Sequence, residues 1–379
     1  MSKLGDAVIH RRRLLLWLLP VTMIVLISNI PRNEFNDVFV HYFDTSIPFR
    51  ADSDFMVENL TGVYINDYSL ESGEPGGISN PQFLKEVEEL ALWIETLPES
   101  VHVDRFTTTM KRLNKSMHGD ADEYYKLPQE RELAAQYLLL YEMSLPYGLD
   151  INNQINVDKS ATRLTHTFGN ISSKQTVAQE EQILDWIEEN TSSIKTVTSG
   201  SIVQTFSRIG LRNSKAMILG TLLALAAISI ILIIALRSLK LGLISLIPNL
   251  TPAAVGFGLW GIFVGEVGIT LSVVTGMSFG IVVDNTVHFL SKYLRAKREN
   301  GLPVEDAIRY AFQTVGKALL VTTSTLVVGF LTLATSSFKL NSDMGLLTAG
   351  VIAIALVNVF LLLPPLLMKI EGPTAKVEV

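Results

Sequence analysis

The chain has 379 residues, of which 48% are hydrophobic and only 18% are charged, so it is too apolar on average for an ordinary soluble protein. Its formal net charge of −6 conceals two populations: residues 31–213 carry 28 acidic and 15 basic side chains, and the remainder carries 9 acidic and 16 basic ones. The sequence contains no cysteine, which excludes disulfides and thiolate metal or redox chemistry.

The chain begins with a basic stretch, residues 1–13, in which Arg11, Arg12 and Arg13 directly precede an apolar run over residues 14–30. Such a pattern can be a cleaved signal peptide. Here the run ends in Ser-Asn-Ile-Pro-Arg, which lacks a small-x-small cleavage site. We therefore interpret 14–30 as an uncleaved transmembrane span, with the basic residues 1–13 in the cytoplasm.

Residues 31–213 form the acidic, hydrophilic part of the chain, and their patterns alternate between strand and helix. Runs of β-branched and aromatic residues predict strands, whereas proline after a capping residue and apolar residues at helical spacing predict helices. The predicted strands cover residues 54–70, 154–168 and 194–200, and residues 101–110 are predicted as a strand or a strand-to-helix transition. The predicted helices begin at Pro81, Pro128 and Thr176. This alternation is typical of a compact α+β domain.

Catalytic motifs are not apparent in this domain. Its histidines lack metal-ligand spacing, and the sequence has neither a Gly-x-Ser-x-Gly nucleophile motif nor a phosphate loop. The carboxylates of Glu86, Glu88 and Glu89 predict a solvated helix face. We expect no cofactor and no bound metal, and we expect a binding or conducting module rather than a hydrolase.

Five further apolar segments follow, each of a length that allows a helix to cross a bilayer. They cover residues 216–236, 242–264, 268–290, 318–335 and 346–367. Residues 291–316 contain an amphipathic helix, and residues 368–379 form a tail. Together with residues 14–30, the sequence predicts a membrane protein with six transmembrane α-helices and one α+β extracytoplasmic domain inserted between spans 1 and 2.

The basic patches give the predicted orientation. They lie before span 1, after span 2, after span 4 and after span 6, positions that all fall on one side of the membrane when there are six spans. Basic loops are retained in the cytoplasm. Both termini are therefore expected in the cytoplasm, and the acidic domain on the opposite side.

One stripe within residues 268–290 carries the functional interpretation. Gly276, Gly280, Asp284 and His288 recur at i+4 spacing, so they share one face of a helix. A charged side chain at bilayer depth costs at least ~2.5–3.5 kcal/mol, and glycines let another helix approach closely. We predict that the stripe packs against another helix and handles protons. The alternative is a structural buried acid bonded to a serine or threonine of a neighbouring helix.

Four membrane segments carry a family resemblance: Ile247-Pro-Asn-Leu-Thr-Pro, Gly280-Ile-Val-Val-Asp-Asn-Thr-Val-His-Phe, Thr322-Thr-Ser-Thr-Leu-Val-Val-Gly-Phe-Leu-Thr-Leu and Gly345-Leu-Leu-Thr-Ala-Gly. They resemble the resistance-nodulation-division (RND) permease superfamily, and within it the MMPL and hydrophobe/amphiphile exporter-3 branch. One span, an external domain and five more spans correspond to one half of such a permease, most similar to the C-terminal half. The external domain would then be porter-like.

The resemblance implies proton-driven export of lipids or other hydrophobic or amphiphilic compounds across a bacterial inner membrane, with residues 31–213 periplasmic. Asp284 matches the intramembrane acid that gains and loses the proton, and Asn285 and His288 match its neighbours. The polar patch that faces this acid is matched by Thr322, Thr323 and Ser324. A carboxylate in a low-dielectric medium favours its neutral form, so protonation would change the preferred packing of the helices.

Members of the superfamily usually have twelve spans in two similar halves, whereas this chain has one half and no internal repeat. The resemblance therefore implies a second RND half as partner: another copy of this chain, a sister chain or the N-terminal half of a longer protein. No nucleic-acid partner is expected. Two alternatives stay open, a SecF-like protein-translocation accessory and a non-transporting, sterol-sensing-like scaffold.

Overall fold

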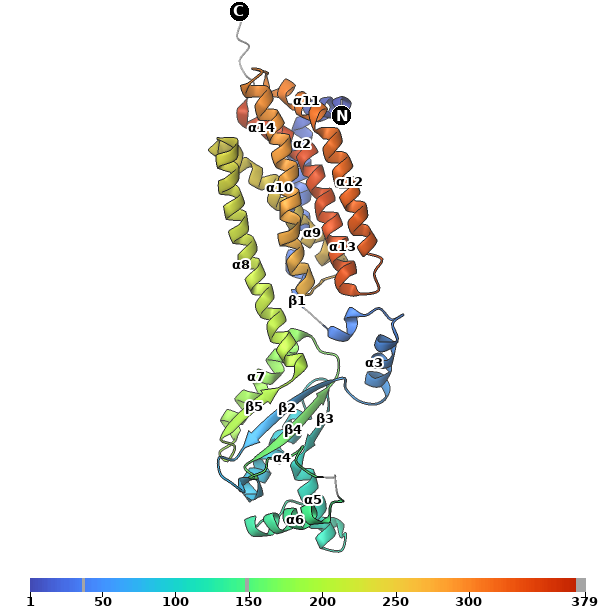
Figure 1. Cartoon of the computed structure of the whole chain (residues 1–379), viewed down its shortest axis with the longest axis vertical. Helices are drawn as coiled ribbons and strands as arrows, with labels where there is room; N and C mark the ends of the chain where they lie inside the picture. Colours follow the sequence, from blue (N-terminus) through green and yellow to red (C-terminus); the bar gives the residue numbers. More distant parts are fainter. Residues whose placement is uncertain (36–37, 147–149, 373–379) are drawn as a thin grey trace, which may run out of the picture. The chain divides into compact units, whose positions relative to one another are not determined.

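The computed structural model describes residues 1–35, 38–146 and 150–372, which divide into two compact units (Figure 1). One unit comprises Met1–Asp37, Tyr42–Asp44 and Leu211–Val379, and we call it the helical unit. The other comprises Val38–His41 and Thr45–Gly210, and we call it the α+β unit. The α+β unit is thus inserted into the sequence of the helical unit, close to the predicted limits of the hydrophilic domain.

The described residues of the α+β unit form a four-stranded antiparallel sheet in the order β3-β4-β2-β5. Its strands are β2 (Tyr64–Glu71), β3 (Ser100–Arg105), β4 (Ala161–Phe168) and β5 (Thr196–Gly200). Tyr68 lies opposite Leu164 in the β2–β4 register, and both side chains are buried. Because side chains alternate between the two faces of a strand, one face of the sheet supplies the core of this unit.

Helices join the strands. They are α3 (Pro48–Asn59), α4 (Pro81–Ile94), α5 (Phe106–Met117), α6 (Arg131–Ser144) and α7 (Ser173–Asn190), with short 3-10 turns η2 (Phe39–Tyr42), η3 (Gly77–Ser79) and η4 (Asp122–Tyr124). Of these helices, α4, α5, α6 and α7 contribute side chains to the core of the unit. Asn80 caps α4 by accepting a hydrogen bond from the Gln82 amide at 2.9 Å. Ser172 and Gln175 form a capping box at the start of α7, the reciprocal arrangement that fixes a helix N-terminus.

The predicted alternation of strands and helices is found, with one clear error. The expected strand over 54–70 is wrong for its first third, because residues up to Asn59 belong to α3 and only Tyr64–Glu71 form a strand. Pro48 occupies the first turn of α3, where a missing N–H costs nothing. Of the aromatic residues that suggested a strand, Phe55 lies on this helix, whereas Tyr64 and Tyr68 lie on β2.

The prediction of a solvated face for the carboxylates of α4 is also wrong. Glu86 is only 2% exposed, and its carboxylate accepts hydrogen bonds from the backbone amides and hydroxyls of Ser192 and Ser193. Glu88 is half-buried and pairs with Lys111 at 2.7 Å. Of the three, only Glu89 is exposed. Glu86 therefore anchors the loop before β5 to a helix that lies about a hundred residues earlier in the chain.

A second buried acid fixes the beginning of α8 (Ile202–Leu236) within the α+β unit. Glu180 of α7 is 4% exposed and accepts hydrogen bonds from the side chains of Ser199, Gln204 and Arg208. A buried carboxylate is costly unless hydrogen bonds satisfy it, and all three of these donors lie at or just before the start of α8. The first turns of α8 are consequently part of the α+β fold, although the same helix continues into the apolar stretch predicted as span 2.

The helical unit contains the remaining elements. They are α1 (Ser2–His10), α2 (Arg12–Ile27), η1 (Ile30–Arg32), β1 (Glu34–Phe35), α9 (Leu239–Phe263), β6 (Glu266–Val267), α10 (Ile269–Arg298), α11 (Val304–Thr314), α12 (Gly316–Leu333), α13 (Lys339–Val357), the π-helix η5 (Asn358–Leu362) and α14 (Leu363–Glu371). Helix α13 packs against α9, α10 and α12, as Figure 1 also shows. Most of the N-terminal basic stretch forms α1, which packs against α11 through Val8 and Ile9.

The connections of the helical unit gather at its two ends. At one end β1 pairs with β6, with Glu34 opposite Glu266, and Phe43 forms a β-bridge with Phe338. At the other end the Lys240 ammonium donates to the Ile370 carbonyl at 2.8 Å, near the N-terminus, α11 and α14 (Figure 1). The acidic or neutral connections thus lie at one end and the basic ones at the other, which is the separation that the predicted alternation of six spans requires.

Among the described residues, five helical stretches are long and apolar enough to cross a membrane. They are Arg12–Arg32, Ile202–Leu236, Leu239–Phe263, Gly316–Leu333 and Lys339–Glu371. The predicted span at 268–290 lies in α10 and is not among the five. This helix carries the polar residues Asp284, Asn285 and His288 within its length. The structure therefore supports several membrane helices, and the number six stays a prediction.

Candidate functional site

The candidate site is one face of α10, which carries the predicted stripe. His288 Nε2 lies 3.3 Å from Asp284 Oδ1, and the two side chains are 57% and 66% exposed. The interpretation of Asp284 as a buried acid is therefore wrong for this chain alone. The stripe is intact as a face of one helix, but no helix among the described residues covers it. The carboxylate and the imidazole therefore lie within ion-pairing distance one helical turn apart.

The two glycines of the stripe are equally open. A Cβ built on Gly276 or Gly280 would meet no neighbouring atom within 4 Å. The glycines of α9 differ: a Cβ on Gly258 would lie 2.1 Å from the Leu26 carbonyl oxygen of α2, and one on Gly256 would lie 2.7 Å from the Val351 side chain. Small residues let helix backbones approach closely. Such close approach occurs at the glycines of α9, whereas no described atom of another helix lies within 4 Å of the Cβ positions of Gly276 and Gly280 on α10.

Asn285 and the polar patch of α12 meet only in part. Asn285 is 4% exposed and its amide donates to the hydroxyl of Thr323, which is 2% exposed, at 3.4 Å. Thr322 donates instead to the Ala318 carbonyl of its own helix at 3.0 Å, and Thr322 and Ser324 are exposed. The structure therefore brings together one of the three predicted patch residues with one residue of the stripe helix.

Two further hydrogen bonds, which the sequence did not single out, join polar groups of neighbouring helices. The hydroxyl of Thr286, which is fully buried, donates to Asn249 Oδ1 of α9 at 2.6 Å. The amide of Asn358, also fully buried, donates to the hydroxyl of Thr251 at 2.7 Å. We call the six residues of these three pairs the polar layer: Asn249, Thr251, Asn285, Thr286, Thr323 and Asn358. It joins α9, α10, α12 and η5.

The backbone is also irregular at the polar layer. Asn358 begins the π-helix η5, and Pro364 follows it. Proline has no N–H, so the ladder of α-helical hydrogen bonds cannot continue through it, and single π-helical turns occur frequently at functional sites. On α9, Pro248 and Pro252 flank Asn249 and Thr251 in the same way. The Pro-Asn and Pro-Pro dipeptides in the sequence indicate that these helices are irregular here, but they do not indicate which residues form hydrogen bonds with each other.

Comparison with known proteins agrees with this architecture. The sequence profile of the MMPL family matches residues 153–378, which is more than half of the chain. The chain belongs to the MMPL family. The family model thereby confirms the predicted resemblance, and the MMPL protein described here is a membrane protein with several apolar helices, consistent with an RND-type transporter.

A curated relative of this MMPL protein comes from Methanocaldococcus jannaschii, and its name says only that it is inferred to be a membrane protein. It is 30% identical over 165 residues, which are 41% of this chain and 42% of the relative. The match spans less than half of the relative's length, so it supports the membrane assignment and carries no activity over to this chain.

Proposed function

We propose that this MMPL protein is a secondary active transporter, not an enzyme, that uses the proton-motive force to export lipids or other hydrophobic or amphiphilic compounds. It works as one half of a two-half RND assembly in a bacterial inner membrane. Both termini are cytoplasmic, and residues 31–213 form a periplasmic porter-like domain. The observation that supports this proposal most strongly is the uncovered face of α10, where Asp284 and His288 lie 3.3 Å apart.

If this face of α10 pointed toward lipid, inserting the chain into the membrane would cost free energy. A carboxylate at the bilayer centre costs at least ~2.5–3.5 kcal/mol, and Asp284 is 66% exposed within this chain. A second helical bundle that packs on Gly276 and Gly280 removes that exposure. The second half can be another copy, a sister chain or the N-terminal half of a longer protein. The polar face then lies between two bundles, where both halves influence it.

Protonation supplies the energy coupling. Neutral Asp284 removes a charge from the interface, which changes the relative free energy of two packing arrangements, the kind of discrete switch that converts a local event into motion. His288 accepts or donates the proton one turn away. The Asn285–Thr323 hydrogen bond fixes the rotation of α10, and the exposed hydroxyls of Thr322 and Ser324 face outward where a second half can contact them.

The test is gradient-driven export in inverted membrane vesicles from cells that make the protein, with a fluorescent phospholipid as the probe. We expect Asp284→Asn to lower proton-dependent export at least tenfold while the protein still inserts and folds. The matched control is Glu299→Gln, which removes an exposed carboxylate with an i+4 partner at the end of the same helix. Export that survives Asp284→Asn would refute the proton-coupling role.

The same variant separates the alternatives. A non-transporting scaffold keeps its function after Asp284→Asn, because its contacts do not depend on a proton cycle. A SecF-like accessory would support protein translocation rather than export of the phospholipid probe, and the match to the MMPL family favours the exporter.

A further inference from the structure

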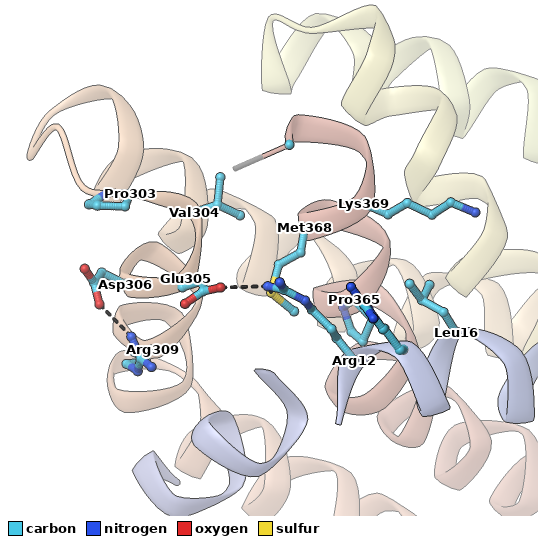
Figure 2. Close-up of a pocket in the computed structure, with 12 residues that line it drawn as sticks. Arg12, Leu16, Pro303, Val304, Glu305, Asp306, Arg309, Pro365, Met368 and Lys369 are labelled. Carbon is cyan, nitrogen blue, oxygen red and sulfur yellow. Dashed lines mark hydrogen bonds and ion pairs between the residues drawn. The ribbon is translucent and has the colours of Figure 1, made fainter. Parts of the chain in front are cut away.

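A second candidate site lies at the basic end of the helical unit. A cavity of about 440 Å³ opens there between α2, the start of α11 and α14 (Figure 2). Its wall combines basic side chains with apolar ones such as Leu16, Pro365 and Met368. The cavity lies where α2 begins and α14 ends, which are the limits of two membrane-spanning stretches. It is therefore at the depth of the lipid headgroups.

The charge of the cavity wall favours an anion. Four cationic side chains line it, namely Arg12, Arg13, Arg309 and Lys369, against the two carboxylates of Glu305 and Asp306. Two of the cations are already neutralised, since Arg12 pairs with Glu305 and Arg309 with Asp306, each at 2.7 Å (Figure 2). Within residues 1–35, 38–146 and 150–372, Arg13 and Lys369 pair with no carboxylate and are exposed. Two positive charges thus remain for a ligand.

The apolar surface beside the cavity indicates what carries that anion. Along α2, Leu14 is 58% exposed, Trp17 is 77% exposed and Leu18 is 54% exposed. Exposed apolar side chains on a membrane helix contact acyl chains, and tryptophan is enriched at the level of the headgroups. A free anion would use the cations but not this surface. A phospholipid uses both, with its phosphate in the cavity and its chains along α2.

We propose that this cavity binds the phosphate headgroup of an anionic phospholipid, with Arg13 and Lys369 as the groups that contact the phosphate. Basic pockets between membrane helices bind anionic headgroups in this way. The paired Arg12 and Arg309 hold the cavity in shape, because Arg12 connects α2 to Glu305 of α11 and Arg309 also pairs with Asp6 of α1 at 2.7 Å. The inference does not depend on the proposed transport, because binding is measured without a gradient.

The experiment measures lipid binding to the full chain in detergent by native mass spectrometry, with phosphatidylglycerol and phosphatidylcholine as probes. We expect the double variant Arg13→Gln/Lys369→Gln to raise the dissociation constant for phosphatidylglycerol about tenfold or more and to leave phosphatidylcholine unchanged. The matched control is Lys292→Gln/Lys317→Gln, which removes two charges from α10 and α12 at the same basic end of the helical unit without touching the cavity wall. Its constant should stay within about twofold of the original.

Three results would overturn the proposal. The first is an equal loss of phosphatidylglycerol in the cavity variant and the control, which would indicate general charge attraction. The second is equal binding of phosphatidylcholine and phosphatidylglycerol by the unmodified chain. The third is full displacement of the lipid by millimolar inorganic phosphate, which would make the cavity a site for a free anion. Thermal unfolding of both double variants checks that each is folded.

Discussion

The imidazole of His288 lies 3.3 Å from the carboxylate of Asp284, one helical turn away on a face of α10 that no other described helix covers. In water, such an exposed pair contributes ~0–1 kcal/mol to stability. In a membrane helix the energetics differ, because exposing a charged side chain to lipid at the bilayer centre costs at least ~2.5–3.5 kcal/mol. We propose that the pair belongs to the half of an interface that this chain supplies.

Replacing His288 should separate stability from function. We expect His288→Gln to change the free energy of unfolding by less than ~0.5 kcal/mol, since both partners are exposed, but to lower gradient-driven export severalfold. Thermal unfolding in detergent and vesicle export measure the two quantities. A large loss of stability with unchanged specific export would show that the pair is structural.

Alanine at two glycines should have opposite effects. We expect Gly258→Ala to destabilise the isolated chain by about 1–3 kcal/mol, because its Cβ would lie 2.1 Å from the Leu26 carbonyl and force α2 away from α9. Gly276→Ala meets no neighbouring atom, so its stability should rise slightly through helix propensity, while export falls. Unfolding and export measurements on both variants check this. Normal export by Gly276→Ala would argue against close packing on the stripe.

The polar layer should respond to loss of one hydroxyl. Thr286→Val leaves Asn249 Oδ1 without its donor in a buried position, and we expect a loss of about 0.5–2 kcal/mol. The control is Thr325→Val, whose hydroxyl donates only within its own helix and is exposed; it should be near neutral. Denaturant unfolding of both variants decides the matter, and equal effects would mean that the layer contributes no stability between helices.

The carboxylate of Glu86 predicts an acid sensitivity of the α+β unit. Burial raises the pKa of Glu86, but hydrogen bonds from Ser193, Gln82 and Ser192 outweigh burial and lower the pKa from 4.5 to about 2. Between these two pKa values the unfolded state binds more protons than the folded state. The contribution of the Glu86 carboxylate to the free energy of unfolding is therefore complete above about pH 5 and is lost as the pH falls toward 2. It amounts to on the order of 3 kcal/mol.

Glu86→Gln should remove most of that pH dependence, whereas Glu89→Gln, on the exposed face of the same helix, should not. Near-ultraviolet circular dichroism can follow unfolding of this unit, because Trp93 and Trp186 stack with ring centroids 5.3 Å apart. An unchanged acid transition in Glu86→Gln would contradict the assignment.

The sequence could predict those structural features that neighbouring residues determine, and it could not predict those that depend on residues far along the chain. The apolar runs and the basic patches indicated the membrane helices and the two ends of the helical unit, because length and charge suffice for that inference. The burial of Glu86 could not be predicted, since the amides that surround it belong to Ser192 and Ser193, far along the chain. A cluster of acids on a helix looks the same whether its partners are water or a distant loop.

The site shows the same division. The i+4 stripe was readable because one helix fixes its geometry, and Asp284 and His288 do lie together. The Thr286–Asn249 bond was not readable, because it joins two helices whose relative rotation no local pattern gives. The partner of the stripe could not be found at all within the described residues, which is the physical reason for proposing a second half.

The most direct test of the account is proximity labelling at Gly280. The chain contains no cysteine, so Gly280→Cys introduces a single thiol, which a maleimide–diazirine reagent can join to whatever lies beside it in native membranes. We predict that Gly280→Cys forms a cross-link to the protein that supplies the second half. Its cross-linking yield should be far higher than that of Val328→Cys on α12, a position where the valine is 62% exposed. Cross-links to lipid alone, with equal yield from both positions, would contradict it.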